Sequence, residues 1–217
     1  MTEQTNPVQA SRSPLHVLAA LLPGLAGLIL VGWLAGELWL SVVGNAEVEA
    51  MRDLAADRGS AITAVARIVT WAGSAWLLAP LGLLCCAALL SRGRPRESLV
   101  PLVSLGGAML LTIAVKALVD RPRPTVEHLQ SVSGPSFPSG HATQASAFWL
   151  SLVVVLVPTA GARHRVIRVC TALAIVLVLA VAASRVWLGV HYPSDVVAGV
   201  TLGAAWAAWV SRTTRTG

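Results

Sequence analysis

The sequence predicts an all-α, polytopic membrane protein built from six transmembrane helices. Hydrophobic residues make up 55% of the 217 residues and charged residues only 12%, whereas soluble domains carry about 25% charged residues. The apolar residues fall into long runs, which short polar, proline-rich or basic segments separate. Composition and arrangement together indicate one compact bundle of membrane spans.

The first half of the chain is expected to contain two spans and one mixed segment. Residues 15–43 form an apolar run long enough for a tilted span, since about 20 residues cross the hydrocarbon core. Glu37 lies in this run and is a functional candidate, although its place near the end of the run also allows it to reach the interface. Residues 45–60 interleave charged and apolar side chains, which predicts either an amphipathic helix on the membrane surface or a solvated loop. The second span is expected at residues 68–90.

Four further spans are expected in the second half, on either side of a proline-containing loop at residues 120–140. Their approximate ranges are 99–119, 142–157, 169–188 and 193–210. We therefore expect a single six-helix domain at residues 15–211, with a disordered N-terminal tail at 1–14 and a C-terminal tail at 212–217.

The basic residues predict the orientation of this domain. Six spans place both termini on one side of the membrane, together with the turns after the second and fourth spans. These segments carry nine arginines: Arg12, Arg92, Arg94, Arg96, Arg163, Arg165, Arg168, Arg212 and Arg215. By the positive-inside rule this face is cytoplasmic, which predicts a multi-pass protein of the cell (inner) membrane with cytoplasmic termini.

The net charge of +6 does not indicate a nucleic-acid ligand. The basic residues occur in short clusters between apolar runs, a distribution that fits membrane topology better than a nucleic-acid surface. The expected partner is the lipid bilayer and not nucleic acid, and the oligomeric state stays unknown.

Three polar clusters, far apart in the sequence, are expected to meet on the outer face. They lie at the end of the third span, at the start of the fourth, and between the fifth and sixth. Their members are Lys116 and Arg123, then Ser139, Gly140 and His141, and finally Arg185, His191 and Asp195. Cations on this face oppose the positive-inside bias, and binding of an anion is the simplest reason for them.

The donors in these clusters suit a phosphoryl group. The guanidinium groups of Arg123 and Arg185 match phosphate oxygens in a bidentate manner, and Lys116 adds a third positive charge. Ser139 and Gly140 begin a helix, where a hydroxyl and free backbone N–H groups attract anions. We therefore expect these five residues to bind a phosphate and to stabilise the charge on its oxygens during transfer.

The two histidines have distinct expected tasks. Asp195 follows His191 by four residues, within reach of its imidazole, and Pro193 suits the first turn of a helix between them. A carboxylate on one ring nitrogen fixes the tautomer and leaves the other nitrogen free to attack. His141 can donate a proton to the leaving oxygen as a general acid. Either histidine alone could be an ordinary interfacial residue, but the whole group together indicates catalysis.

These residues resemble the three-part signature of the type 2 phosphatidic acid phosphatase superfamily. The matching segments are Lys116 to Arg123-Pro124, Pro138-Ser-Gly-His141, and Ser184-Arg185 to His191 and Asp195. The site also resembles that of vanadium haloperoxidases.

The resemblance implies a nucleophilic His191 that forms a phosphohistidine, oriented by Asp195, and a His141 that protonates the leaving group. It implies that Lys116, Arg123, Ser139, Gly140 and Arg185 hold the phosphoryl oxygens. It also implies that no metal or other cofactor is required, and the sequence shows no carboxylate cluster suited to Mg²⁺.

The resemblance leaves the substrate open. We expect hydrolysis of a membrane-lipid phosphate, with phosphatidate or phosphatidylglycerol phosphate favoured. A phosphatase for undecaprenyl or another prenyl diphosphate, recycling a cell-wall carrier lipid, is the alternative within the class. A non-catalytic lipid or phosphate transporter is disfavoured because the inner halves of the last four runs are almost wholly apolar. A vanadate-dependent oxidation is disfavoured by the bundle of spans.

Overall fold

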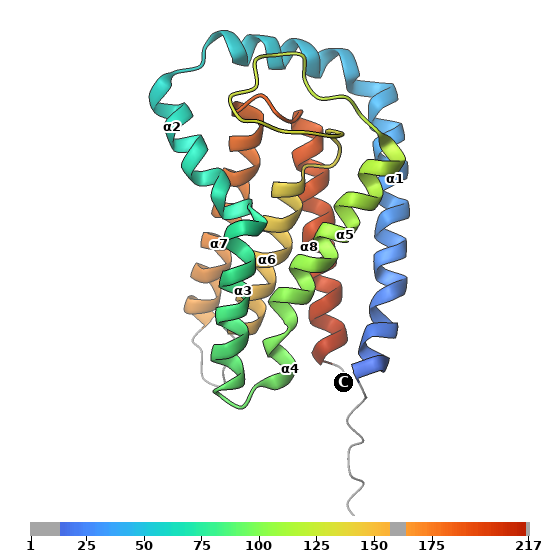
Figure 1. Cartoon of the computed structure of the whole chain (residues 1–217), viewed down its shortest axis with the longest axis vertical. Coiled ribbons are helices and arrows are strands. Elements are labelled where there is room, and N and C mark those ends of the chain that lie inside the picture. Colours follow the sequence, from blue (N-terminus) through green and yellow to red (C-terminus); the bar gives the residue numbers. More distant parts are fainter. Residues whose placement is uncertain (1–13, 157–163, 216–217) are drawn as a thin grey trace, which may run out of the picture.

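The computed structural model describes residues 14–156 and 164–215, and these residues form a helical bundle in which no strand occurs. The long helices run side by side, and the loop between α5 and α6 covers one end (Figure 1). The all-α prediction is therefore confirmed. The elements are α1 (Pro14–Ala56), α2 (Ser60–Val69), the 3₁₀ helix η1 (Thr70–Gly73), α3 (Ala75–Leu90), α4 (Pro95–Ser98), α5 (Val100–Val119), α6 (Gly140–Leu156), α7 (His164–Trp187) and α8 (Pro193–Arg215).

Helix α1 is 43 residues long and has two parts. Its first part lies along the bundle, and its last part crosses the end of the bundle that the α5–α6 loop covers (Figure 1). Of the two interpretations of residues 45–60, a helix is therefore correct for residues 45–56. Met51 and Glu47 in the crossing part are only 1% and 6% exposed, because this part packs against the bundle. Glu37 is exposed and lies outside the polar clusters.

The described residues confirm a multi-pass membrane protein, while the six-span count stays a prediction. Three stretches in residues 14–156 and 164–215 are each long and apolar enough to cross a membrane: Ala19–Val42, Pro95–Val119 and His164–Trp187. The segments Ser60–Gly73 and Ala75–Leu90 qualify together as a fourth, although a 45° bend separates them. Helix α6 is apolar but shorter, with 17 residues.

The second predicted span is thus broken rather than continuous. Ser74 interrupts it as the N-cap of α3 and accepts a hydrogen bond from the backbone N–H of Trp76 at 3.3 Å. Gly73 permits the bend to pass close to α6, since a Cβ at Gly73 would lie 2.7 Å from the His141 carbonyl oxygen. The break brings Thr70 towards the polar end of α7, where its hydroxyl accepts a hydrogen bond from Arg185.

Helix α6 lies between α5, α7 and α8 and contacts all three. Its contact with α8 is unusually close because α8 presents glycines to it. A Cβ added at Gly203 would lie 2.3 Å from the Thr143 carbonyl oxygen, and one at Gly199 would lie 2.7 Å from that of Ser139. This close approach places the start of α6 beside the start of α8, where the backbone N–H of Ser139 donates to the Asp195 carbonyl oxygen at 2.9 Å.

We predict that Gly203→Ala destabilises the protein, because its methyl group would meet the α6 backbone. Overpacking of this kind costs about 1–3 kcal/mol. The control is Gly106→Ala on α5, where a Cβ would meet nothing within 4 Å. The measurement is the apparent Tm in detergent, which should fall by several degrees for Gly203→Ala alone. Equal Tm values for the two variants would contradict the close α6–α8 contact.

Candidate active site

The predicted clusters meet at the covered end of the bundle, where α5 and α7 end and α6 and α8 begin (Figure 1). Lys116 is close enough to Arg123, Arg185 and Asp195 to interact with them electrostatically. His141 is similarly close to Arg123, Arg185 and His191. Three sequence-distant segments therefore form one polar centre, as the sequence predicts.

His191 and Asp195 form a buried pair at this centre, with exposures of 3% and 0%. The Nδ1 atom of His191 lies 3.4 Å from Oδ2 of Asp195. The same carboxylate oxygen accepts hydrogen bonds from the Ser136 hydroxyl and from the backbone N–H of Tyr192, the latter at 2.8 Å. Because Nδ1 faces the carboxylate, Nε2 on the far side of the ring is the nitrogen available to a substrate.

The environment of His191 keeps its imidazole neutral. Burial lowers the pKa of His191 to about 4, although the hydrogen bond to Asp195 and the charge of Asp195 oppose this shift. A neutral ring retains a free electron pair at neutral pH, as a nucleophile requires.

Arg185 and Ser139 offer donors that the described protein atoms do not use. Arg185 is 1% exposed, and its Nη1 donates to Thr70 Oγ1 at 2.7 Å and to Gln130 Oε1 at 2.5 Å. Its Nε and the hydroxyl of Ser139 are buried without a hydrogen-bond partner among residues 14–156 and 164–215. Buried polar atoms normally have partners, so each of these two atoms is a donor available to a bound anion.

Lys116 and Arg123 hold the α5–α6 loop through its backbone carbonyl groups. Lys116 donates to the carbonyls of Pro135 and Ser136. Arg123 donates to Gly134 at 2.9 Å from Nε and to Val190, the residue before His191, at 2.7 Å from Nη1. Both cations therefore fix the loop around the centre while adding positive charge to it.

Sequence reasoning missed several residues that complete the centre. The sequence pattern assigned no role to Arg121. In the structure its side chain is 4% exposed and forms salt bridges with Asp195 at 2.7 Å and with Glu47 of α1 at 2.8 Å. No local pattern indicates Glu47, because its partner lies 74 positions away. Gln130 and Ser136 lie in the α5–α6 loop, and the sequence does not indicate the path of this loop, so it could not place these side chains at the centre. No group of three metal-binding side chains occurs in the part of the chain that the structure describes, and the predicted independence of metals stays a prediction.

The comparison with protein families places this centre in a known context. The model of the PAP2 superfamily matches residues 97–216, which contain all three predicted clusters. The chain belongs to the PAP2 superfamily. The resemblance inferred from the sequence is therefore confirmed, and with it the assignment to a family of lipid phosphatases.

Two curated relatives of this PAP2 protein are named as phosphatases. Phosphatidylglycerophosphatase B of Bacillus subtilis (strain 168) is 30% identical over 135 residues, which cover 62% of this chain and 66% of the relative. Decaprenylphosphoryl-5-phosphoribose phosphatase of Mycobacterium tuberculosis is 37% identical over 131 residues, which cover 57% and 67%. The chain thus spans about two thirds of the length of each relative.

A solved structure resembles this protein over most of its length. It is a transmembrane PAP2-type phosphatidylglycerolphosphate phosphatase from Bacillus subtilis, with a TM-score of 0.80 and 25% sequence identity. The similarity covers 88% of this chain and 96% of the other. It confirms the transmembrane fold, including helices that lie before the region matched by the family model.

We predict that His191 titrates far below an ordinary histidine. Its imidazole should gain a proton only as the pH falls through about 4, because burial opposes the charged form. The measurement is NMR of histidine-labelled protein in detergent micelles, with the His191 signal assigned by its loss in His191→Gln. A midpoint at pH 6 or above would contradict the buried, neutral ring.

Proposed function

We propose that this protein hydrolyses the phosphomonoester or diphosphate headgroup of a membrane lipid through a phosphohistidine at His191. The observation that carries the proposal is the buried His191–Asp195 pair beside the unpartnered donors of Arg185 and Ser139. A neutral nucleophile next to an electropositive, water-shielded anion site is the combination that phosphoryl transfer requires.

In the first step, the phosphoryl oxygens bind to Arg185, Ser139 and the backbone N–H groups at Gly140, in the positive field of Lys116 and Arg123. Nε2 of His191 attacks phosphorus, the bond from phosphorus to the lipid oxygen breaks, and His141, which enters the step in its protonated form, gives that oxygen a proton. Asp195 stabilises the positive charge that develops on the imidazole.

In the second step, water attacks the phosphohistidine and His141 takes the proton of that water. The bond between phosphorus and Nε2 breaks, which releases inorganic phosphate and regenerates neutral His191. The three cations provide charge stabilisation of the kind that metal ions give other phosphotransferases. We therefore infer that added metal is not required.

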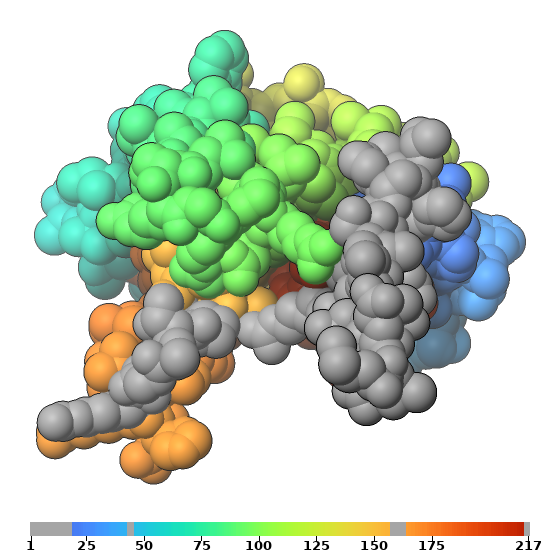
Figure 2. Space-filling model, turned by 90° about the horizontal axis from the view of Figure 1, so that it is seen from below, coloured from blue at the N-terminus to red at the C-terminus, as the bar shows by residue number. Residues whose placement is uncertain are grey.

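The arrangement of charges also supports an outward-facing site. Two exposed arginines, Arg92 in the turn after α3 and Arg96 in α4, belong to the end of the bundle opposite the active site (Figure 1). Figure 2 looks onto that end, where the α3–α4 region and the start of α7 form the green and orange parts of the surface. By the positive-inside rule the arginine-bearing end is cytoplasmic, which supports a periplasmic or outer active site in the cell membrane.

Among substrates, phosphatidate and phosphatidylglycerol phosphate remain the leading candidates, and the phosphatidylglycerophosphatase relative supports the second of them. A prenyl-linked phosphate is the other candidate, since the second relative is named for a decaprenyl lipid. Release rates from phosphatidate, phosphatidylglycerol phosphate and undecaprenyl diphosphate, measured side by side, distinguish these possibilities.

We predict that His191→Ala lowers phosphate release from the preferred lipid by roughly a thousandfold or more, because it removes the nucleophile. The assay uses purified protein in detergent with EDTA present. His164→Ala is the control, since His164 is exposed at the start of α7, at the other end of the bundle. Full turnover by His191→Ala would refute the phosphohistidine mechanism, and phosphate uptake by vesicles without hydrolysis would favour a transporter instead.

A further inference from the structure

A glutamate on α1 is joined to the active site through buried contacts. Glu47 lies near the end of α1, the helix whose last part crosses the covered end of the bundle (Figure 1), and outside the region 97–216 that the family model matches. Its Oε1 accepts the backbone N–H of Ser194 at 2.7 Å, and its Oε2 accepts the Ser194 hydroxyl at 2.7 Å and Arg121 at 2.8 Å. A carboxylate at the start of α8 is also favoured by the helix dipole.

Arg121 connects Glu47 to the catalytic carboxylate. Its Nη2 donates to Glu47, while its Nη1 donates to Asp195 Oδ1 and to the Ser194 hydroxyl, both at 2.7 Å. The two oxygens of Asp195 are thus divided: Oδ1 faces Arg121, and Oδ2 faces His191. The contacts run in sequence from Glu47 to Arg121, then to Asp195 and to the nucleophile.

The charges explain why a second carboxylate is useful. All three charged groups are nearly inaccessible, with exposures of 6%, 4% and 0% for Glu47, Arg121 and Asp195. Without Glu47, the guanidinium would have Asp195 as its one counterion and would weaken the negative charge that His191 needs. With Glu47 present, the group carries one net negative charge, which suits the positive imidazole formed during phosphoryl transfer.

We propose that Glu47 is a positioning residue that acts through Arg121 to orient Asp195 and keep it available to His191. This inference rests on the proposed phosphohistidine mechanism. It assigns α1 a part in catalysis, because Glu47 is the residue of α1 through which that helix reaches the Asp195–His191 pair.

The test compares Glu47→Gln with Glu49→Gln, an exposed neighbour on the same segment. Glu47→Gln should lower kcat about 10–100-fold, the usual cost of losing a supporting contact, while KM stays within about twofold because Glu47 does not touch substrate. Glu49→Gln should match the wild type. The double variant Glu47→Gln/Arg121→Gln should be no slower than Arg121→Gln alone, since Glu47 acts through Arg121.

The outcomes separate this inference from the proposed function. An active wild type with an unchanged kcat in Glu47→Gln, or losses that simply add in the double variant, would overturn the role of Glu47 alone. An inactive wild type would overturn the proposed function. If Glu47→Gln does not fold, Arg121→Lys tests the same link, because an ammonium group lacks the fork that joins both carboxylates, and an unchanged kcat there would also overturn it.

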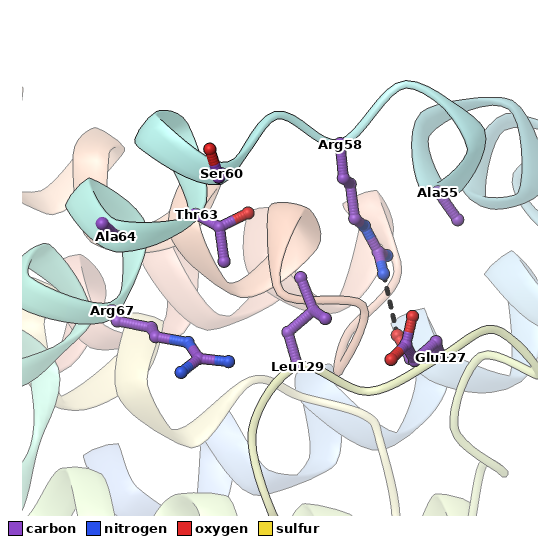
Figure 3. Close-up of a pocket in the computed structure, with 8 residues that line it drawn as sticks. All are labelled: Ala55, Arg58, Ser60, Thr63, Ala64, Arg67, Glu127 and Leu129. Carbon is purple, nitrogen blue, oxygen red and sulfur yellow. Dashed lines mark hydrogen bonds between the residues drawn. The ribbon is translucent and has the colours of Figure 1, made fainter.

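A separate polar pocket of about 390 Å³ lies against α2. Its lining comes from the end of α1, the connection between α1 and α2, one face of α2 and the α5–α6 loop: Ala55, Arg58, Ser60, Thr63, Ala64, Arg67, Glu127 and Leu129 (Figure 3). Residues on other faces of α2 are apolar and exposed: Ile62 at 55%, Val65 at 58% and Ile68 at 72%. The pocket therefore adjoins a helix whose apolar side is suited to lipid.

The positive charges of this pocket exceed its negative charge, and Glu127 is close enough to Arg58 to interact with it electrostatically. Arg58 and Arg67 extend into it from two sides (Figure 3), and neither forms a salt bridge with any described residue. Arg58 donates from Nη1 to the Glu127 carbonyl oxygen at 2.8 Å. Its Nε and Nη2 are buried, and no described residue accepts a hydrogen bond from them. Unused guanidinium donors fit a phosphate group.

We infer that this pocket binds the phosphate of an anionic phospholipid headgroup, separately from the catalytic centre. Two arginines less one glutamate give one net positive charge, which matches the single charge of a phosphodiester. The pocket also lies next to the catalytic loop, since a Cβ at Gly189 would be 2.6 Å from Arg58 Nη2. A bound headgroup that fixes Arg58 would therefore stabilise the turn at Gly189, which lies two residues before His191.

The test measures the apparent Tm in neutral detergent with added dioleoyl phosphatidylglycerol, dioleoyl phosphatidylcholine or inorganic phosphate. Of the two lipids, phosphatidylglycerol alone should raise the Tm of the wild type by several degrees, whereas any rise with inorganic phosphate, the product of the proposed reaction, should come from the catalytic site and persist in Arg58→Gln/Arg67→Gln. Arg58→Gln/Arg67→Gln should lose most of this rise, while Arg92→Gln/Arg96→Gln, which removes equal charge from the opposite end, should keep it. If the first double variant does not fold, Arg67→Gln replaces it, because Arg67 is exposed.

Equal losses in both double variants would overturn the inference, as would an equal rise with phosphatidylcholine. A rise with inorganic phosphate that Arg58→Gln/Arg67→Gln loses would instead indicate a free-anion site in this pocket and would also overturn the lipid assignment.

Discussion

The division of the Asp195 carboxylate between two partners is the constraint on which the rest of the structure depends. One oxygen faces Arg121 and the other faces His191, and no part of the side chain is exposed. A fully buried carboxylate is tolerable only if its oxygens are satisfied. The Ser136 hydroxyl and the Tyr192 backbone N–H donate the remaining hydrogen bonds to this carboxylate. The Asp195 carboxylate therefore connects the α5–α6 loop to the start of α8.

The bundle is arranged to bring these polar groups together in a chain that is otherwise apolar. Glycines on α8 let it approach α6 closely, and the break at Ser74 bends the chain so that Thr70 reaches Arg185. The glycines allow closer helix packing and the break interrupts a span, and both features bring polar groups nearer to the centre. Local irregularity in this protein therefore coincides with the site, as is common in functional regions.

The cations combine structural and electrostatic tasks. Lys116 and Arg123 donate hydrogen bonds to backbone carbonyl groups of the α5–α6 loop. By contrast, Nε of Arg185 is buried and has no hydrogen-bond partner among the described residues. The first two thus shape the enclosure and add a positive field, and the third is the one with a donor left for an anion. In a poorly solvated site such fixed charges act more strongly than in water.

The sequence by itself determined the all-helical membrane class and the family resemblance, and it predicted eight site residues that the structure brings to one end of the bundle. It could do so because membrane spans require long apolar runs. Charged residues at the ends of such runs also carry a free-energy cost in the membrane, so their presence indicates a functional site. It did not indicate Glu47, the bend at Ser74 or the role of Arg121. Those depend on contacts such as the one between Arg121 and Glu47, separated by 74 positions, and only the tertiary structure decides which distant residues share a buried charge. Spacing along a chain specifies neighbours on one helix, whereas the pairing of helices and the path of a loop follow from packing of the whole bundle.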